Sequence, residues 1–327
     1  MQLPELPPSL AAGLDALLDV YDRRRLEAAA TRLSETYRGR EEGASRAART
    51  AEDVAAYAAY RAPATFAAVE DVLRRIATQR PDWRPGSVLD VGAGPGIASW
   101  AAAAVWPEIE RFTLVEAEPE MIALGQRLAV AAPTRPLATA QWVSGDAAVP
   151  GEPADLVLAS YVLGELRDVD QAVRRLWERA ADTLVLVEPG TPAGYARVIE
   201  AREGVLAAGG FTLAPCPHDT ACPLTGGDWC HFAVRLSRGE AHRVVKGVSR
   251  GFEDEKLSYA ALSRSAAPRP AARIIRPPLV RSGHIHLDTC EAGGLAHRIV
   301  SRRDKDAFRA ARKAGWGDTM DVDTVDV

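Results

Sequence analysis

The first 215 residues of this 327-residue chain contain no cysteine. A disulfide, a thiolate metal site and a cysteine nucleophile are therefore excluded from the first two thirds of the chain. All four cysteines, Cys216, Cys222, Cys230 and Cys290, lie in the last third. Any thiol chemistry must belong to that part, where four thiolates are enough for one structural zinc ion or one iron–sulfur cluster.

The chain also lacks a long apolar run. No stretch approaches the roughly 20 apolar residues that span a membrane, so we expect no membrane partner. The first ten residues lack the basic and then apolar segments of a signal peptide. We therefore expect a cytoplasmic protein, in which thiols stay reduced and a cysteine cluster more often indicates a metal than a disulfide.

Short apolar runs alternate with helical patterns in the middle of the chain. This alternation predicts an α/β fold with a parallel, doubly wound sheet. The expected strands span residues 88–91, 112–116, 141–144, 156–160 and 182–188, and the expected helices span 121–131, 170–180 and 197–208.

The flanking regions have different patterns. Apolar residues recur at helical spacing near the start, and Pro63 is expected to break or start a helix there. Short β-like runs follow residue 209, and residues 301–314 predict a basic helix. We divide the chain into an N-terminal helical region (1–84), an α/β domain (85–209), a β-rich cysteine region (210–317) and an acidic tail (318–327).

A glycine-rich loop follows the first strand of the α/β domain. Its glycines, Gly92, Gly94 and Gly96, permit a tight turn and close approach of a ligand to the start of the next helix. Ile97 stands where a dinucleotide-binding loop has its last glycine, and Asp90 also departs from that motif. The loop resembles the first motif of class I S-adenosylmethionine-dependent methyltransferases.

Three further strand ends agree with this resemblance. Glu116 ends the second strand, where a carboxylate can accept both ribose hydroxyl protons. Asp146 and Ala147 follow the third strand, where that class contacts adenine, and Ser160 and Tyr161 end the fourth, facing the methyl group. Ligands bind open α/β sheets at these carboxyl ends, so we expect S-adenosylmethionine contacts from Asp90 and the three loop glycines together with these positions.

The sequence leaves catalysis open. The Asn-Pro-Pro-Tyr motif of many amino-group methyltransferases is absent, because Ser160 and Tyr161 occupy its place. The cysteine nucleophile of RNA cytosine C5-methyltransferases is also absent from this part of the chain. Tyr161 and Glu165 are the remaining candidates for a catalytic group.

The spacing of the cysteines bears on the choice of metal. Five residues separate Cys216 from Cys222 and seven separate Cys222 from Cys230, so no paired hook of the zinc type exists. Wide spacing favours an iron–sulfur cluster, while His218 and His231 leave a mixed zinc site as the alternative. Unliganded thiols are the third possibility.

Charge is unevenly distributed along the chain. The net charge is −4, yet residues 235–313 hold 18 Lys and Arg against 8 Asp and Glu, a net +10 that leaves −14 elsewhere. A basic segment suggests an anionic partner such as RNA, and a solvated arginine-rich surface is the alternative. Candidate phosphate contacts are Arg235, Arg243, Lys246, Arg250, Arg302 and Arg303.

Together these motifs resemble the methyltransferase-like small-ribosomal-subunit proteins of the Rsm22 family of mitochondria and bacteria. The resemblance covers about residues 50–300 and rests on the combination rather than on the glycine loop. It is carried by Tyr60-Arg61-Ala62-Pro63, the loop from Asp90 to Gly96, Val187-Glu188-Pro189-Gly190, Asp228-Trp229-Cys230-His231, Arg281-Ser282-Gly283-His284 and the four cysteines.

The resemblance implies a class I methyltransferase fold with an added cluster-binding region. It implies that Cys216, Cys222, Cys230 and Cys290 hold a [4Fe-4S] cluster and that the protein associates with the small ribosomal subunit and its rRNA. An active rRNA methyltransferase, a non-catalytic assembly factor and a small-molecule methyltransferase with structural zinc all remain open. The oligomeric state is not indicated.

Overall fold

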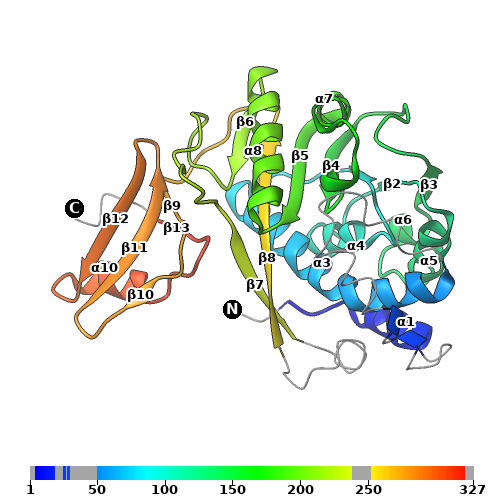
Figure 1. The fold of residues 1–327 in the computed structure, drawn as a ribbon, viewed down its shortest axis with the longest axis horizontal. Helices are drawn as coiled ribbons and strands as arrows, with labels where there is room; N and C mark the ends of the chain where they lie inside the picture. The colour runs from blue at the N-terminus through cyan, green and yellow to red at the C-terminus, as the bar shows by residue number, and fades with distance from the viewer. Residues whose placement is uncertain (1–3, 19–24, 27, 30–49, 238–251, 321–327) are drawn as a thin grey trace.

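The main sheet of the computed structural model begins with five parallel strands in the order β3-β2-β1-β4-β5 (Figure 1). The structure describes residues 4–18, 25, 26, 28, 29, 50–237 and 252–320. The strand order reverses direction at β1, which is the doubly wound arrangement, so the predicted Rossmann-like α/β class is confirmed. The five strands are β1 (Ser87–Val91), β2 (Arg111–Glu116), β3 (Gln141–Ser144), β4 (Ala154–Ser160) and β5 (Ala180–Pro189).

Three later strands extend this sheet. β8 (Phe252–Ser263) runs antiparallel to β5, and β6 (Phe211–Ala214) and β7 (Phe232–Ser237) both pair with β8. Residues beyond 209 therefore complete the main sheet. The four-part division at residues 84, 209 and 317 describes the sequence and stays a prediction.

Alternation along the strands sends apolar side chains to two cores. Val88 and Leu114 belong to the core under one layer of helices, whereas Leu89 and Val115 belong to the core under the other. The first layer contains α1 (Pro8–Leu18), α3 (Ala51–Gln79), α4 (Ile97–Val105), α5 (Pro119–Ala129) and α6 (Arg135–Ala138), and the second contains α7 (Val169–Arg179) and α8 (Pro192–Ala207).

Helix α3 runs without a break through Pro63. The prediction that Pro63 breaks or starts a helix is wrong. A proline inside a helix loses one backbone hydrogen bond and kinks the chain. Buried neighbours such as Ala62, Ala64 and Phe66 pack this part of α3 into the core, and that burial outweighs the local preference.

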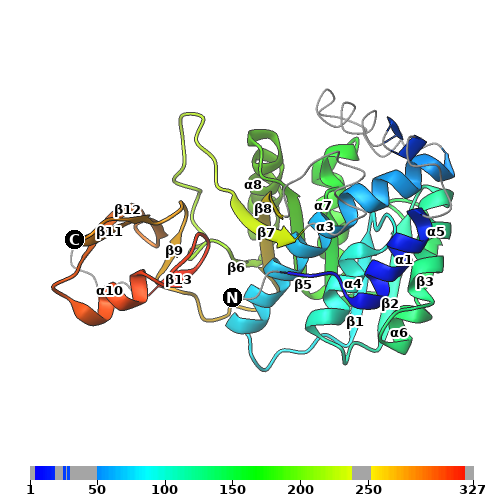
Figure 2. The ribbon, with the colours of Figure 1, turned by 90° about the horizontal axis from the view of Figure 1, so that it is seen from below.

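A second, smaller sheet lies beside the main one. Its order is β10-β11-β9-β13, with β12 on β11, and α10 (Lys305–Ala311) packs on one face (Figures 1 and 2). The helix predicted at 301–314 is shorter, because β12 continues to Ser301 and Asp304 caps the first turn. The strands are β9 (Ala272–Ile274), β10 (Leu279–Val280), β11 (His284–Glu291), β12 (Gly294–Ser301) and β13 (Thr319–Met320).

The described helices give no sign of a membrane span. None of them combines the length and the apolar composition that crossing a membrane requires.

Thr50 begins helix α3 with a reciprocal cap. Its hydroxyl oxygen accepts a hydrogen bond from the Asp53 amide at 3.1 Å, and the Asp53 carboxylate accepts one from the Thr50 amide at 3.2 Å. We expect Thr50→Ala to lower the free energy of unfolding by about 1 kcal/mol, because an amide donor at the helix end loses its partner. Denaturant unfolding followed by circular dichroism measures this change.

Thr78→Ala is the matched control in the same helix. The Thr78 hydroxyl bonds only to the Arg74 carbonyl at an exposed position, and alanine has the higher helix propensity. We expect this variant to be neutral or slightly more stable. Equal losses in the two variants would contradict a capping role for Thr50.

Candidate cofactor and cysteine sites

The glycine loop between β1 and α4 has the backbone that the sequence predicts. Gly92, Gly94 and Gly96 all have positive φ angles, of 67°, 53° and 81°. A side chain at Gly92 would overlap Val162, with its Cβ 2.3 Å from a Val162 methyl carbon. A Cβ at Gly94 would meet no atom within 4 Å, so open space lies over the centre of the loop.

Glu116 fastens this loop to the end of β2. One carboxylate oxygen accepts a hydrogen bond from the Gly94 amide at 2.7 Å. The other accepts from the amides of Ala117 and Glu118, at 2.8 and 2.9 Å. The carboxylate is therefore held beside the open space over Gly94, where it can exchange a backbone donor for ligand hydroxyl groups.

Asp90 is completely buried at the end of β1. One of its oxygens accepts hydrogen bonds from the amide and hydroxyl of Ser99, at 3.2 and 2.8 Å, while the other has no partner. Burial raises the pKa of Asp90 to about 7, against the hydrogen bonds from Ser99, which lower it. An orphaned acceptor beside the glycine loop fits a site that is completed by a polar ligand.

The structure brings the predicted cofactor residues to one edge of the sheet. Asp146 binds the amide of Ala148 at 2.7 Å in the turn after β3, and Ala147 beside it is buried. All of the predicted positions lie at the carboxyl ends of β1 to β4, namely Asp90, Gly92, Gly94, Gly96, Glu116, Asp146, Ala147 and Ser160.

Tyr161 follows β4 in a strained conformation. Its φ of 58° is the only positive value at a non-glycine position among the described residues. Its hydroxyl donates a hydrogen bond to Glu255 at 3.0 Å, and Glu255 in turn pairs with Arg61 at 3.0 Å. Burial, and then the Glu255 charge, hold the pKa of Tyr161 well above its usual range, so its hydroxyl is a neutral donor rather than a base.

The sequence did not predict this chain of contacts among Tyr161, Glu255 and Arg61. Arg61 and Glu255 are 194 residues apart, and no local pattern links them. The other catalytic candidate, Glu165, ends the short 3₁₀ turn Leu163–Glu165 after β4.

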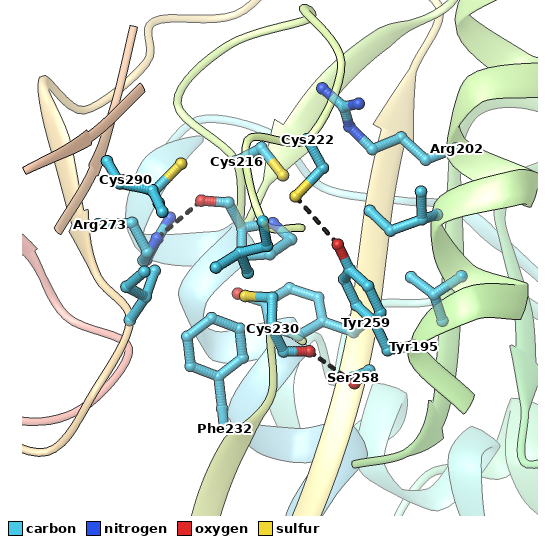
Figure 3. Close-up of a pocket in the computed structure, with 16 residues that line it drawn as sticks. Tyr195, Arg202, Cys216, Cys222, Cys230, Phe232, Ser258, Tyr259, Arg273 and Cys290 are labelled. Carbon is cyan, nitrogen blue, oxygen red and sulfur yellow. Dashed lines mark hydrogen bonds between the residues drawn. The ribbon is translucent and has the colours of Figure 1, made fainter. Parts of the chain in front are cut away.

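The four cysteines line one cavity (Figure 3). Cys216 and Cys222 lie in the loop after β6, and Cys230 lies just before β7. Cys290 comes from β11 of the small sheet. Three ligand candidates from the main body therefore meet one from the small sheet, and apolar side chains such as Val198 line the space between them.

The thiols influence one another electrostatically. Burial raises the pKa of Cys230 well above its usual range, and the charges of Cys216, Cys222 and Cys290 raise it further. Burial and the same neighbours raise the pKa of Cys290 to about 12. Four thiolates cannot share this space without a compensating positive charge, such as that of a metal centre.

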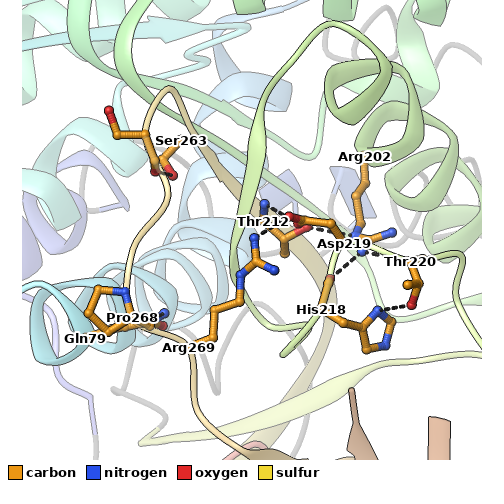
Figure 4. Close-up of polar contacts among 10 residues, drawn as sticks. Gln79, Arg202, Thr212, His218, Asp219, Thr220, Ser263, Pro268 and Arg269 are labelled. Atoms are coloured by element: carbon orange, nitrogen blue, oxygen red, sulfur yellow. Dashed lines mark hydrogen bonds and ion pairs between the residues drawn. The ribbon is translucent and has the colours of Figure 1, made fainter. Parts of the chain in front are cut away.

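Two buried arginines flank the cavity without a carboxylate partner among the described residues. Arg202 is 1% exposed and donates to Thr212 and to the carbonyls of His218 and Thr220, at 3.2, 2.6 and 3.1 Å, while its Nη1 has no acceptor (Figures 3 and 4). Arg273 is 3% exposed and donates only to the carbonyls of Pro215 and Gly317. Both positive charges are near the thiols and lower the pKa of Cys216 against its burial.

The sulfur arrangement distinguishes the two metals considered. A single tetrahedral zinc with Zn–S bonds of about 2.3 Å needs sulfurs roughly 3.8 Å apart. No group of three His, Cys, Asp or Glu side chains in the described part of the chain converges in this way. A [4Fe-4S] cube binds each thiolate through a different iron and so accepts wider separations. Four thiols around one cavity are the donor set that such a cluster uses.

Polar neighbours hold two of the sulfurs. The Tyr195 hydroxyl lies 3.1 Å from the Cys222 sulfur, and His218 Nε2 lies 3.3 Å from the Cys290 sulfur. Asp219 ties the same loop to Arg269 and to the Thr212 amide (Figure 4). His231, considered as a zinc ligand, instead stacks on Trp229 with ring centroids 5.2 Å apart.

Many arginines of the basic segment serve the fold. Arg235 pairs with Asp254 at 2.7 Å, so its charge is neutralised within β7 and β8. Arg264 lies 3.8 Å over the Trp177 ring, and Arg276 pairs with Asp228. Arg302 and Arg303 are exposed. The remaining phosphate-contact candidates, Arg243, Lys246 and Arg250, lie outside the described residues.

The sequence of this chain matches one known protein family. The family model described as mitochondrial small ribosomal subunit Rsm22 matches residues 51–321. The human ribosome assembly protein METTL17, mitochondrial, is 30% identical over 297 residues, covering 81% of this chain and 62% of that protein. The Rsm22-cox11 tandem protein 2, mitochondrial, of Schizosaccharomyces pombe is 27% identical over 333 residues, covering 84% of this chain and 44% of that protein. The chain thus spans about half the length of these relatives.

Solved methyltransferase structures are more distant. Magnesium protoporphyrin IX methyltransferase from Synechocystis PCC 6803, with bound SAH, is 14% identical with a TM-score of 0.41 and covers 62% of this chain and 84% of its own. Precorrin-6y C5,15-methyltransferase from Geobacter metallireducens is 15% identical with a TM-score of 0.40 and covers 61% and 89%.

The prediction of a cytoplasmic location is wrong. The family is described as mitochondrial, and both of these relatives carry the same term in their names. The prediction rested on the absence of a secretory signal, and that absence does not separate the cytoplasm from an organelle.

Asp90 gives the cofactor edge a testable pH dependence. The folded protein keeps a proton on Asp90 up to about pH 7, whereas the unfolded chain releases it near the ordinary value of 3.8. The contribution of Asp90 to stability therefore falls as pH rises from about 4 to 7. Between about pH 4 and pH 7 we expect the free energy of unfolding of ligand-free Asp90→Asn to fall less with rising pH than that of the wild type. Urea unfolding at several pH values measures this difference. Equal pH dependence in the two proteins would contradict a raised pKa for Asp90.

Proposed function

The chain belongs to the mitochondrial small ribosomal subunit Rsm22 family, and on that premise we propose that it is an assembly factor of the small ribosomal subunit that binds S-adenosylmethionine and a [4Fe-4S] cluster. The observation that carries the proposal is the meeting of three loop cysteines and Cys290 of the small sheet beside two buried guanidinium groups that have no carboxylate partner among the described residues. Assembly is the role named for the human relative, a ribosome assembly protein.

Charge balance supports the cluster. A four-thiolate [4Fe-4S] centre carries a net negative charge of about two units. Arg202 and Arg273 supply two buried positive charges that have no carboxylate partner among the described residues. Buried charges are costly unless they are paired, so a dianionic centre in this cavity would offset both. Cys216, Cys222, Cys230 and Cys290 would hold it.

Cofactor binding is supported by the edge at the ends of β1 to β4. Gly94 leaves open space over the loop, Glu116 places a carboxylate beside it, and Asp90 has an unused acceptor there. When bound, S-adenosylmethionine supplies a methyl group activated by its sulfonium. The residues of this chain would then bind the ribose and position the amino-acid end.

The contacts of Tyr161 favour binding over catalysis. Its hydroxyl is committed to Glu255, and Glu255 is committed to Arg61, so neither presents a free base at the methyl edge. We therefore propose that assembly depends on neither methyl transfer nor bound cofactor. Small-subunit rRNA is the proposed partner, with Arg302 and Arg303 among its phosphate contacts.

The cluster is tested by metal content. We expect protein purified without oxygen to be brown and to contain about four irons per chain, because four cysteines are available. Cys290→Ser should lose most of this iron, since the small sheet then contributes no thiolate. Iron, sulfide and zinc analysis with visible absorption measures the outcome.

Tyr195→Phe is the matched control for the cluster. It removes the hydroxyl beside the Cys222 sulfur but no ligand, so iron content should stay unchanged. Its reduction potential should fall, because hydrogen bonds to sulfur stabilise the reduced cluster. A colourless wild-type protein with one zinc per chain would refute the proposal.

A pair of glycine variants tests whether assembly requires cofactor binding. Gly94→Arg should abolish S-adenosylmethionine binding in calorimetry, because the side chain enters the open space over the loop. Gly209→Arg is the control, since Gly209 also has a positive φ of 82° and open surroundings but lies after α8. Its affinity should match that of the wild type.

The same variants then enter a deletion strain. We expect Gly94→Arg to restore the small-subunit peak in sucrose gradients, because the proposed assembly role does not require bound cofactor. Failure of Gly94→Arg, with success of Gly209→Arg and equal protein levels, would favour an active rRNA methyltransferase instead.

A further inference from the structure

The small sheet has one face covered by α10, and its other face is exposed along His284 to Asp288 but buried at Cys290 against the cysteine cavity. Along β11, Ile285 and Leu287 point into the core beneath α10, so His284, His286 and Asp288 point the other way. β12 places His297 on the same open side, in register with Asp288. Figure 2 shows α10 on the opposite side of these strands. We call the side formed by His284, His286 and His297 the histidine face.

Three of the six histidines in the chain form a row on this face. The ring centroids of His284 and His286 are 4.8 Å apart, and those of His286 and His297 are 5.2 Å apart. His286 Nδ1 lies 3.0 Å from His297 Nε2, and Asp288 holds His297 Nδ1 at 2.7 Å. The three imidazoles thus contact one another, with His284 and His297 exposed and His286 partly exposed.

Apolar side chains flank the row. Leu279 of β10 and Ile299 of β12 are both in register with His286, on its two sides, and are 47% and 49% exposed. Four of the six large apolar side chains exposed in the described part of the chain belong to this sheet, including Val280 and Leu295. A surface of rings and apolar groups fits a partner with flat apolar faces and polar edges.

One end of the row carries unpaired positive charge. The amide of Arg302 donates to Gly283 at 2.9 Å, which brings the turn after β12 beside the start of β11. Arg281, Arg302 and Arg303 therefore cluster near His284. None of the three pairs with an acidic side chain among the described residues. The acids of this sheet are engaged elsewhere, Asp288 with His297 and Glu291 with Arg298.

We propose that the histidine face binds a single-stranded RNA segment, with bases stacked on the imidazoles and phosphates held by Arg281, Arg302 and Arg303. The inference rests on the proposed function, for which it names the RNA-binding surface. Single strands expose base faces for stacking on aromatic side chains, whereas a duplex hides them. A protein partner would not require a row of imidazole rings beside a cluster of arginines, so we make it an outcome of the test.

The test measures binding of a fluorescent oligouridine strand to the full chain purified without oxygen. We expect His286→Ala and His297→Ala each to weaken binding by roughly 5- to 150-fold, the range for loss of one stacking partner. Arg302→Ala with Arg303→Ala should lower the magnitude of the log–log salt dependence by about 1.4, since each phosphate contact contributes roughly 0.7. A matched RNA duplex should bind more weakly than the single strand.

Two exposed residues elsewhere provide matched controls. Val130 is 80% exposed, and Arg174 pairs with Asp170 on α7. Val130→Ala and Arg174→Ala should leave both affinity and salt dependence unchanged. The inference is overturned if the histidine variants bind oligouridine as tightly as the wild type, or if the control variants lose as much. It is also overturned if the variants lose ribosome association while keeping RNA affinity, because the face would then bind a protein.

Rescue of a deletion strain distinguishes failure of the RNA-binding surface from failure of the proposed assembly role. We expect the combined His286→Ala, His297→Ala, Arg302→Ala and Arg303→Ala variant to retain its iron but to fail to restore the small-subunit peak. Full restoration by that variant would overturn the RNA surface and leave the assembly role standing. A deletion strain with no small-subunit defect would instead overturn the assembly role, whatever the oligouridine measurements give.

Discussion

Two buried positive charges determine which kind of group the cysteine cavity favours. Arg202 from α8 and Arg273 from β9 are almost completely buried, yet their described acceptors are a hydroxyl and carbonyl oxygens. Neutral acceptors compensate a buried guanidinium poorly, so this arrangement is expensive unless a negative group occupies the cavity between them. The four cysteines line this cavity, and in the proposed function they supply that charge as thiolates on the cluster. Arginines and thiols therefore depend on each other, and the position of the small sheet depends on both.

Strand β8 connects this region to the cofactor edge. Glu255 near its start pairs with Arg61 and accepts from Tyr161, at the end of β4 where the methyl group would lie. Three residues further along, the Ser258 hydroxyl donates to the carbonyl of Cys230. β8 also pairs with β5 for most of its length, so it cannot shift without disturbing the sheet. Tyr161 and the Cys230 loop are therefore both fastened to one strand that is itself held in the main sheet.

The predictable parts of this fold are those with local causes. Strands such as 88–91 and 182–188 are buried on both faces, so a continuous apolar run identified them. β12 has no such run, because exposed Leu295, His297 and Ile299 alternate with the buried side chains of Arg298 and Val300. The roles of the arginines could not be predicted, because ion pairs form between residues that are distant in sequence. The number of Lys and Arg residues in a segment does not distinguish Arg235, which Asp254 neutralises, from Arg302, which is exposed. The eight predicted cofactor positions lie at one edge because strand ends converge wherever a sheet is doubly wound.

A methyltransferase fold alone does not imply methyl transfer here. Catalysis at the end of β4 would need a group able to take a proton from the acceptor atom or to orient it. Tyr161 occupies that place, but its backbone is held in a left-handed conformation and its hydroxyl is committed to Glu255. Strain of this kind costs of order 1–3 kcal/mol and persists where the surroundings enforce it. In this conformation Tyr161 connects α3, β4 and β8 through Glu255 and Arg61, and the connection holds α3 on the sheet. Tyr161 thus fixes the end of β4 against α3 and β8, where its hydroxyl is a donor to Glu255.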